Sequence, residues 1–325
     1  TTIGNDSYGY ILNEAGSSFN NSSTGTVSLD SLGSYVYSKG TTVVNNKNIT
    51  MLGRENVAFY TEGGSVTNYG DIKGTGGIND IGNIGIYNKN GFVVNNGTIE
   101  VGDTHIINPG ATEENFYAVG IYGVDSNVTN ASGAVIRVGA DGVGIYGGKS
   151  DDAVSRPTII NEGLITSNKS GAQGMFIVNA NGINKGIIHL TGDNSTGIVA
   201  EGATITNAAG AKIIIDGNNS TGVYLSRGSV LNNEGTIEIN GTNSTGVIKA
   251  SAGASIPIGD TAPNIIIGAG ATGSKEVGTA GKAYVKPSIV NAGLIKVNDN
   301  FSINNFDMII EPNLNTGKQE TYTNS

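Results

Sequence analysis

The sequence predicts a right-handed parallel β-helix, in which the chain winds into a rod of stacked rungs and each rung contributes three strands. Three observations support this fold class: a short unit recurs along the chain, small and β-branched residues dominate, and glycine is abundant. The 325 residues include 51 glycines and no tryptophan, and aromatic residues make up only 6%. A core this thin suits an elongated stack, in which each layer buries its inner side chains against the next layer.

The repeating unit begins with two aliphatic residues and an asparagine, and a short strand of the form Ile-x-Val follows after a glycine. Examples are VVNNGTIEV at 93–101, VLNNEGTIEI at 230–239 and IVNAGLIKV at 289–297. The third strand carries a glycine, an aliphatic residue and often a tyrosine, as in VGIY at 143–146 and STGVY at 220–224. A fixed triple-strand unit is typical of a solenoid, whereas hairpin sandwiches and helical folds lack it.

One asparagine marks each rung, and we expect these side chains to point inward and to hydrogen-bond amide to amide along the axis. The gap from Asn232 to Asn291 is too long for one rung. We interpret Ile256, 265–267 and 284–285 as a degenerate rung whose asparagine is lost, which gives about eleven rungs. The marker asparagines are Asn13, Asn45, Asn68, Asn95, Asn130, Asn161, Asn184, Asn207, Asn232 and Asn291.

Alternation along each strand assigns one face to the core. In the third strand, the expected inward column comprises Phe59, Ile86, Ile121, Ile145, Met175, Ile198, Val223 and Val247. In the second strand, pairs such as Ile99 with Val101 point inward, and Glu100, His189 and Glu238 face water. In the first strand, the residue two before the asparagine points inward: Ile11, Val43, Val66, Val93, Val128, Ile159, Ile205, Val230 and Ile289. Glycines at the corners supply the positive φ angles that the bends between sheets need.

We expect one solenoid domain over 1–325, with regular rungs over about 10–297 and an irregular C-terminal layer and tail over 298–325. Insertions interrupt the repeat at its corners. Three of them lie between second and third strands, at 74–82, 102–117 and 268–281. A fourth lies between a third and a first strand, at 148–157.

The overall charge excludes several classes of partner. The net charge is −9 and the pI is near 4.7, so neither nucleic acid nor an anionic membrane surface is an expected partner. The chain has no cysteine and only two histidines, His105 and His189, far apart in the sequence. We therefore expect no metal site, no cofactor and no catalytic residue. No apolar run long enough for a membrane helix occurs, and residues 1–25 lack the features of a signal peptide.

Two sequence motifs could also be interpreted as parts of a ligand-binding or catalytic site. GAGATG at 268–273 matches a dinucleotide-binding fingerprint, but SKEVGTAGK follows it, where a helix would be needed. Asp151 and Asp152 resemble the paired carboxylates of glycosidases. They lie beside serine and proline in an insertion, so we interpret the pair as a solvated turn.

Two surfaces are candidate partner-binding sites. Aromatic residues recur at one outward position of the third strand: Tyr37, Tyr60, Tyr87, Tyr122, Tyr146, Phe176 and Tyr224. This column is either a ladder that stabilises the stack or a stripe that anchors a partner, with Tyr87, Tyr122 and Tyr146 as the contacts. The second candidate is the insertion 102–117, which mixes acids and aromatic residues. Its proposed contact residues are His105, Glu113, Glu114, Phe116 and Tyr117.

The repeat V-x-N-x-G-x-I-x-V followed by N-S-T-G-V-Y resembles the passenger region of bacterial autotransporters, the type V secretion system. It is most similar to the large repeat-built fusobacterial adhesins, and the resemblance covers about 10–297. It implies a signal peptide and an outer-membrane β-barrel that this chain does not contain, and therefore an excised passenger fragment on the bacterial cell surface. The serine-protease motif G-D-S-G of the family's enzymatic members does not occur.

These observations favour a surface adhesin segment, a monomer that attaches to a host-cell or bacterial receptor of protein or glycan without inserting into a membrane. The alternative is a structural spacer that presents a distal binding tip. A carbohydrate-active β-helix enzyme is a third interpretation, but the sequence offers no acid-lined cleft for it, and we expect the chain not to be an enzyme. The insertions separate the first two functions, because a pure spacer needs only uniform rungs.

Overall fold

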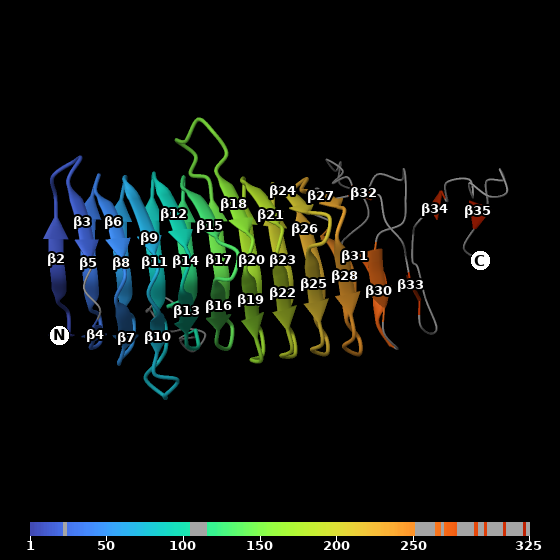
Figure 1. Ribbon diagram of the computed structural model, residues 1–325. Coiled ribbons are helices and arrows are strands. Elements are labelled where there is room, and N and C mark those ends of the chain that lie inside the picture. The colour runs from blue at the N-terminus through green and yellow to red at the C-terminus, as the bar shows by residue number, and fades with distance from the viewer. Residues whose placement is uncertain are drawn as a thin grey trace, which may run out of the picture.

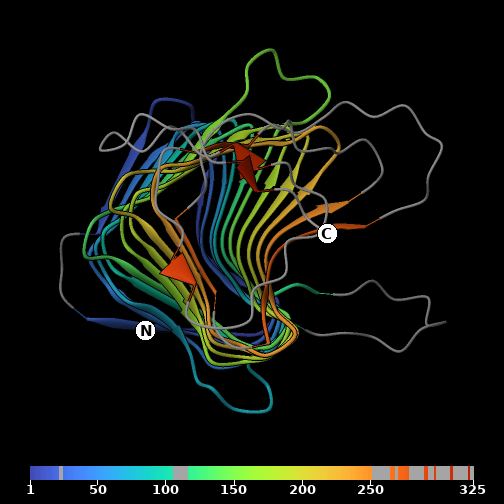
Figure 2. The same cartoon turned by 90° about the vertical axis from the view of Figure 1, so that its right-hand side faces the viewer.

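The computed structural model describes residues 1–21, 25–104 and 116–250, and beyond them 264–267, 270–277, 289–291, 296–297, 308–309 and 321–322. The described residues form three long parallel sheets and contain no helix. Figure 1 shows the strands stacked side by side as a rod, and Figure 2, turned to look along it, shows the sheets around one interior. The predicted parallel β-helix with three-strand rungs is therefore confirmed.

Each sheet is named here after its recurrent residue. The tyrosine sheet contains β2 (Tyr8–Leu12), β5 (Ser34–Lys39), β8 (Val57–Glu62), β11 (Ile84–Lys89), β14 (Val119–Val124), β17 (Val143–Gly148), β20 (Gln173–Val178), β23 (Thr196–Glu201), β26 (Thr221–Ser226), β29 (Thr245–Ala250) and β31 (Thr272–Val277). The asparagine sheet contains β3 (Ser18–Asn21), β6 (Thr42–Asn45), β9 (Ser65–Asn68), β12 (Phe92–Asn95), β15 (Asn127–Asn130), β18 (Thr158–Asn161), β21 (Asn181–Asn184), β24 (Thr204–Asn207), β27 (Val230–Asn233) and β32 (Ile289–Asn291).

The isoleucine sheet contains β1 (Thr2–Ile3), β4 (Thr26–Leu29), β7 (Asn48–Met51), β10 (Ile72–Gly74), β13 (Thr98–Val101), β16 (Val135–Val138), β19 (Leu164–Ser167), β22 (Ile187–Leu190), β25 (Lys212–Ile215), β28 (Thr236–Ile239), β30 (Asn264–Ile267) and β33 (Lys296–Val297). Outside these sheets, β34 (Met308–Ile309) pairs antiparallel with β35 (Thr321–Tyr322).

Nine complete rungs run from β2 to β28, each with one strand in the tyrosine, asparagine and isoleucine sheets in turn. The expected number of about eleven came from ten marker asparagines and one degenerate rung, and strands β29 to β33 extend the three sheets beyond β28. The degenerate rung expected between Asn232 and Asn291 is confirmed in part: residues 265–267 lie in β30, which pairs between β28 and β33, and this rung contributes no described strand to the asparagine sheet. Strand β32 pairs directly with β27, and the long gap is occupied by β30 and β31, which extend the other two sheets. Ile256 and 284–285 lie outside the described residues.

A continuous ladder of buried asparagine side chains runs along the corner between the asparagine and isoleucine sheets. In each step the Nδ2 of one asparagine donates to the Oδ1 of the next, as from Asn161 to Asn184 and from Asn184 to Asn207, both at 2.9 Å. Eight such bonds of 2.7–3.4 Å join nine asparagines: Asn21, Asn45, Asn68, Asn95, Asn130, Asn161, Asn184, Asn207 and Asn233. The predicted amide-to-amide stacking is confirmed.

Two of the predicted marker asparagines, Asn13 and Asn232, are not in the ladder. Asn13 is exposed and follows β2 in the tyrosine sheet, and the ladder begins instead at Asn21 in β3. In the pair Asn232–Asn233 the second residue is in the ladder, because Asn233 has the Asn-x-Gly spacing that turns the corner. The same shifts mean that Ile11, expected to point inward, is 58% exposed, and that Leu231 rather than Val230 is buried.

The interior is filled by stacked aliphatic columns, as the alternation predicts. All eight third-strand residues from Phe59 to Val247 are buried, and so are Ile99 with Val101 in the second strand. A glycine before seven of these eight inward residues, such as Gly174 before Met175, allows successive rungs to approach closely, and Ala58 occupies the position before Phe59. A Cβ atom on Gly174 would lie 2.4 Å from the carbonyl oxygen of Gly197 in the next rung, so a side chain cannot be accommodated there without a shift.

The corners use more than glycine. Among the described residues, eleven that are not glycine have a positive φ, including Asn194, Asn219 and Asn243 at one corner. Asparagine and aspartate tolerate the left-handed region better than other residues, which explains why they alternate with glycine at these bends. Glycine supplies positive φ at other corner positions, such as Gly171 and Gly202, as the sequence predicts.

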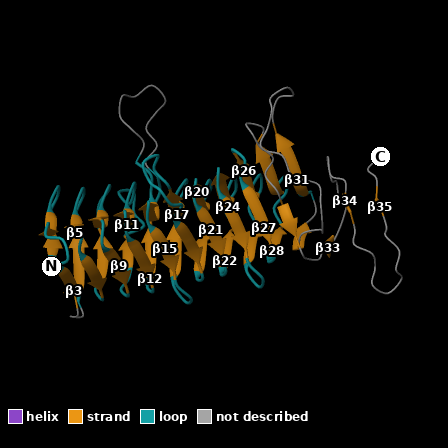
Figure 3. Cartoon of the chain, turned by 90° about the horizontal axis from the view of Figure 1, so that it is seen from above, coloured by secondary structure: helices purple, strands orange, loops and turns teal. Residues whose placement is uncertain are grey.

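Three of the four predicted insertions lie at the expected corners. The loop after β10 and the loop after β13 connect the isoleucine and tyrosine sheets, and the loop between β17 and β18 connects the tyrosine and asparagine sheets. Figure 1 shows the β17–β18 loop projecting on the opposite side from the loop after β10, and Figure 3 shows the strands of successive rungs lying parallel. The insertion predicted at 268–281 is wrong, because residues 272–277 form β31 and extend the tyrosine sheet.

The ladder generates a stability prediction. Asn207 donates to Asn233 at 2.7 Å and to the Thr236 carbonyl at 3.3 Å, and it accepts from Asn184. Asn207→Leu removes these bonds inside the core, and we expect it to lower the free energy of unfolding by about 1–3 kcal/mol. The outward control Glu238→Ala should cost less than about 0.5 kcal/mol. Equal shifts in the thermal melts of the two variants would contradict the assigned faces.

Candidate partner-binding site

The aromatic column lies on the outer face of the tyrosine sheet, where strand register brings one ring from each rung into line. Tyr60 pairs with Tyr87, and Tyr122 pairs with Tyr146, on neighbouring strands. Ring centroids are 4.5 Å apart in the first pair and 4.4 Å in the second, with interplanar angles of 14° and 16°. The Tyr37–Tyr60 and Tyr87–Tyr122 pairs are also stacked, at 5.5 and 5.4 Å.

The column ends at Phe176, whose ring is tilted by 30° against Tyr146. The next position is Val199, so Tyr224 does not continue the stack as the sequence suggested. Each ring within the stack has its two faces against neighbours, and what remains for solvent is the ring edge and the hydroxyl. This arrangement supports the interpretation as a stabilising ladder, since parallel aromatic pairs add stability beyond their buried area.

Stacking also changes the acidity of the phenols. Partial burial and the adjacent Tyr60 raise the pKa of Tyr87 to about 12, and burial with the adjacent Tyr122 does the same for Tyr146. Burial likewise raises the pKa of Tyr60 and Tyr122. A tyrosine that is harder to ionise in the fold favours the folded state only while its phenol stays neutral.

The loops after β10 and β13 meet at the corner between the isoleucine and tyrosine sheets, as predicted for insertions on consecutive rungs. Ile81 forms a parallel bridge with Asp103, and the Gly82 amide donates to the Asp103 carbonyl at 2.8 Å. The buried carboxylate of Asp80 accepts from the Gly76 and Gly102 amides and from Asn83 Nδ2. The first loop is thereby fixed to the corner of the next rung.

The predicted contact residues fall into two groups at this corner. Phe116 and Tyr117 are 40% and 56% exposed, and Phe116 lies close to Gly82 of the neighbouring loop. His105, Glu113 and Glu114 lie outside the described residues. The structure therefore brings two of the five loop residues to the two-loop corner and places Tyr87, Tyr122 and Tyr146 together on the tyrosine sheet.

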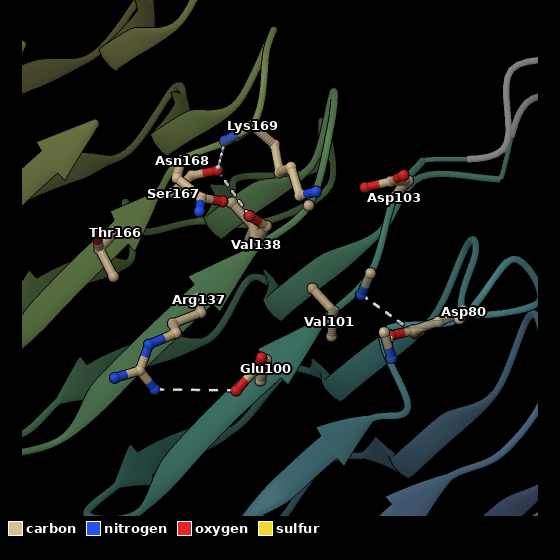
Figure 4. A pocket seen from close by; sticks show the side chains of 14 residues that line it. Asp80, Glu100, Val101, Asp103, Arg137, Val138, Thr166, Ser167, Asn168 and Lys169 are labelled. Atoms are coloured by element: carbon tan, nitrogen blue, oxygen red, sulfur yellow. Dashed lines mark hydrogen bonds and ion pairs between the residues drawn. The ribbon is translucent and has the colours of Figure 1, made fainter. Parts of the chain in front are cut away.

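Beside this corner lies a groove that the sequence did not reveal, with a volume of about 360 Å³. Four successive rungs line it: Gly76, Gly77 and Asp80, then Glu100 to Asp103, then Arg137 to Gly139, then Thr166 to Lys169. Figure 4 shows acidic side chains on the side of the earlier rungs and Arg137 and Lys169 on the side of the later ones. Glu100 and Arg137 are registered neighbours on β13 and β16 and form an ion pair at 3.9 Å.

Within the described residues, no three or more histidines, cysteines, aspartates or glutamates are grouped to hold a metal ion, and no helix is present that is long and apolar enough to span a membrane. His189 faces outward and contacts Asp216 at 2.7 Å, in the same column as Glu100 and Glu238. Partial burial alone would raise the pKa of Asp216, but hydrogen bonds from Asn240 and His189 lower it below its usual value.

Asp151 and Asp152 are both exposed in a turn between β17 and β18, as interpreted from the sequence. The GAGATG segment leads from its described residue Gly270 into strand β31, so no helix follows a glycine-rich turn there. The described neighbourhood of these two motifs therefore lacks the elements that their chemical alternatives require.

Comparison with known families supports the same architecture. The family model for the third pectate lyase-like domain of BigA matches residues 1–210. The chain belongs to this family. BigA is a bacterial surface protein, and the family therefore places the chain among bacterial surface proteins built on a β-helix. The matched part of the BigA-family chain contains the stacked column, the two-loop corner and the groove. No curated protein and no solved structure matches the chain.

The stacked column generates a pH prediction. Because the pKa of Tyr87 and Tyr146 is raised to about 12 in the fold, their stabilising effect is complete below the unfolded value near 10 and is lost as the pH rises from 10 towards 12. An absorbance titration of tyrosinate should therefore show a late group of phenols. In the double variant Tyr87→Phe/Tyr146→Phe this group should shrink, and the alkaline fall in melting temperature should become smaller. Ionisation of every tyrosine in one step near 10 would contradict the stack.

Proposed function

We propose that this chain is an adhesin segment of a bacterial surface protein and that it attaches to a receptor on host cells or on other bacteria. The BigA-family match supports the surface location, and the β-helix supplies a rigid rod that holds loops away from its axis. Functional residues concentrate on loops that a rigid scaffold positions. The proposed contact surface is the two-loop corner with its neighbouring aromatic residues.

The observation that carries this proposal is the pairing of two insertions on consecutive rungs. The bridge between Ile81 and Asp103 and the buried Asp80 carboxylate hold the loops together, so the corner is a built surface. Phe116 and Tyr117 are exposed there, and exposed aromatic side chains often anchor protein interfaces. Glu113 and Glu114 add negative charge in the sequence, which favours a basic patch on the partner.

A finer assignment follows from the sequence resemblance. We propose that the parent protein is a type V autotransporter, most similar to the fusobacterial adhesins, and that this chain is part of its passenger region at the outer membrane. The regular rungs support this, and so does the absence of cysteine, because a chain without disulfides crosses a secretion pore unfolded more easily. We also propose that the chain binds as a monomer and does not act as an enzyme, since a pectate lyase-like fold does not by itself carry an activity.

A spacer role is the second candidate for the later rungs. From Asn161 onwards the ladder advances by 23, 23 and 26 residues per rung, without a large insertion up to Asn233. Uniform rungs of this kind serve to extend a rod. The two functions are compatible in one chain, with the binding corner on the earlier rungs and a shaft formed by the later ones.

Replacing the second loop tests the adhesion proposal. Asp103, Thr104 and Ala118 should be kept, because Thr104 Oγ1 accepts from the Ala118 amide at 3.1 Å and donates to the Asp141 carbonyl. Residues 105–117 are then replaced by a Gly-Asn turn. We expect attachment of the purified chain to whole cells to fall while the melting temperature stays within a few degrees, because surface loops contribute little to stability. Attachment of the unmodified chain should weaken with added salt.

The matched control shortens the other projecting loop. Residues 151–156 between β17 and β18 are replaced by the same turn, and attachment should be retained. If the 105–117 variant attaches as well as the unmodified chain at an unchanged melting point, the two-loop corner is not the contact surface. If both loop variants attach equally less, the effect is not specific to the corner.

A further inference from the structure

The groove beside the two-loop corner has an ordered separation of charge along the rod. Glu100 and Asp103 lie at the end of β13 and just after it, whereas Arg137 belongs to β16 and Lys169 follows β19. The acids therefore face one side of the groove and the cations face the other, as Figure 4 shows. Strands of successive rungs are about 4.8 Å apart, so Asp103 and Lys169 are separated by two rungs, or about 10 Å along the axis.

These charged side chains differ in the hydrogen bonds and ion pairs that they already make within the protein. The Asp80 carboxylate is buried and accepts three hydrogen bonds, so it serves the loop rather than a ligand. Asp103 is exposed and uses one oxygen to accept from the Ala140 amide at 2.6 Å. Lys169 is exposed, and in the described part of the chain no carboxylate lies within ion-pair distance of its Nζ. Arg137 and Glu100 are each about half exposed across their 3.9 Å contact.

The floor and walls of the groove suit a polypeptide better than a sugar. Gly76, Gly77, Gly102 and Gly139 contribute backbone without side chains, which gives an extended chain room to approach. No aromatic side chain is among the described residues that line the groove, so a neutral sugar has no ring on which to stack. A uniformly anionic glycan would be repelled by the carboxylates of Glu100 and Asp103. A uniformly basic segment would be repelled by the positive charges of Arg137 and Lys169.

We propose that this groove binds an extended peptide segment of the receptor that carries a basic side chain towards Asp103 and Glu100 and an acidic side chain towards Arg137 and Lys169. The proposal rests on the adhesion function and specifies its partner as a protein with both charges in one segment. An extended segment in the polyproline II conformation advances about 3.1 Å per residue and repeats its side-chain direction every third residue, so a spacing of about 10 Å places the two charged residues roughly three positions apart on one face. The groove is continuous with the two-loop corner through Asp103 and enlarges that contact surface.

A charge exchange within the groove provides the test. The double variant Glu100→Arg/Arg137→Glu keeps the net charge and the possibility of an ion pair, but it exchanges the charges at these two positions while Asp103 and Lys169 keep theirs. We expect cell attachment to weaken by roughly tenfold, because each charged side chain of the partner then meets a side chain of its own sign at positions 100 and 137. The matched control exchanges an ion pair between neighbouring rungs at 3.0 Å, Glu162→Lys/Lys185→Glu, whose residues follow β18 and β21 and do not line the groove. Unchanged melting temperatures show that both variants are folded.

An array of synthetic peptides identifies the ligand class directly. The array holds glycine-rich peptides with one lysine and one glutamate at spacings of one to five residues, peptides with lysine only, and peptides with glutamate only; oligogalacturonate is tested in solution as a uniform polyanion. The unmodified chain should bind the mixed-charge peptides best near a spacing of three, and the Glu100→Arg/Arg137→Glu variant should lose that preference. Preferential binding of oligogalacturonate or of single-sign peptides, or no binding to the array, would overturn the proposal.

The two tests separate the groove from the wider function. Loss of attachment on loop replacement, with full attachment of the groove-exchange variant, would retain the adhesion function and reject the groove as a peptide site. Full attachment of both the loop variant and the groove variant would reject both proposals together. Loss in the groove variant but not in the Glu162→Lys/Lys185→Glu control supports an oriented contact rather than a general dependence on surface charge.

Discussion

The buried asparagine ladder is the interaction on which the rest of the structure depends. Each inner amide, from Asn45 to Asn207, donates to the next rung and accepts from the previous one. Asn45, Asn68 and Asn95 also donate to the carbonyl two residues later, where the chain turns from one sheet to the next. An amide in this position is costly to leave unpaired in a dry core. A slip of one residue would remove the asparagine from the ladder and turn the inward column outwards, so the ladder and the aliphatic columns specify the same register.

This register explains both candidate surfaces. When every rung is fixed at the same corner, residues at equal distance from the corner fall into straight columns on the outside of the rod. Tyr60 and Tyr87 stack for this reason, whereas Glu100 and Arg137 become neighbours because the inward aliphatic residues of β13 and β16 pair in register. The insertions then form loops that project from the rod without disturbing the columns, because each one begins and ends at a corner. The stacked tyrosines chiefly consolidate one sheet, whereas the two-loop corner and the groove provide a surface of mixed charge and shape.

The fold was largely predictable because the repeat is periodic and its inward residues are chemically distinct from its outward ones. Prediction failed where local sequence was ambiguous: the consecutive pair Asn232–Asn233 offered two registers, and only the Asn-x-Gly spacing distinguishes them. The insertion at 268–281 was wrong because a glycine-rich segment can also form an edge of the tyrosine sheet, as β31 does. The groove was missed for another reason. Its charges come from rungs up to about 90 residues apart, and a search for motifs within one segment does not align Asp80 with Lys169. Aligning the second strands by their inward aliphatic pairs, Ile99 with Val101 and Ile136 with Val138, would have placed Glu100 beside Arg137.

Hydrogen exchange of the asparagine side-chain amides tests the central role of the ladder most directly. Nuclear magnetic resonance can follow the Nδ2 protons of Asn161, Asn184 and Asn207, with the exposed Asn168 as an internal reference. If the ladder holds the rungs in register, the three buried amides should exchange only when the rod unfolds, as slowly as the backbone amides of the core strands. Exchange of the Asn184 amide as fast as that of Asn168, in a chain whose core backbone remains protected, would contradict the account.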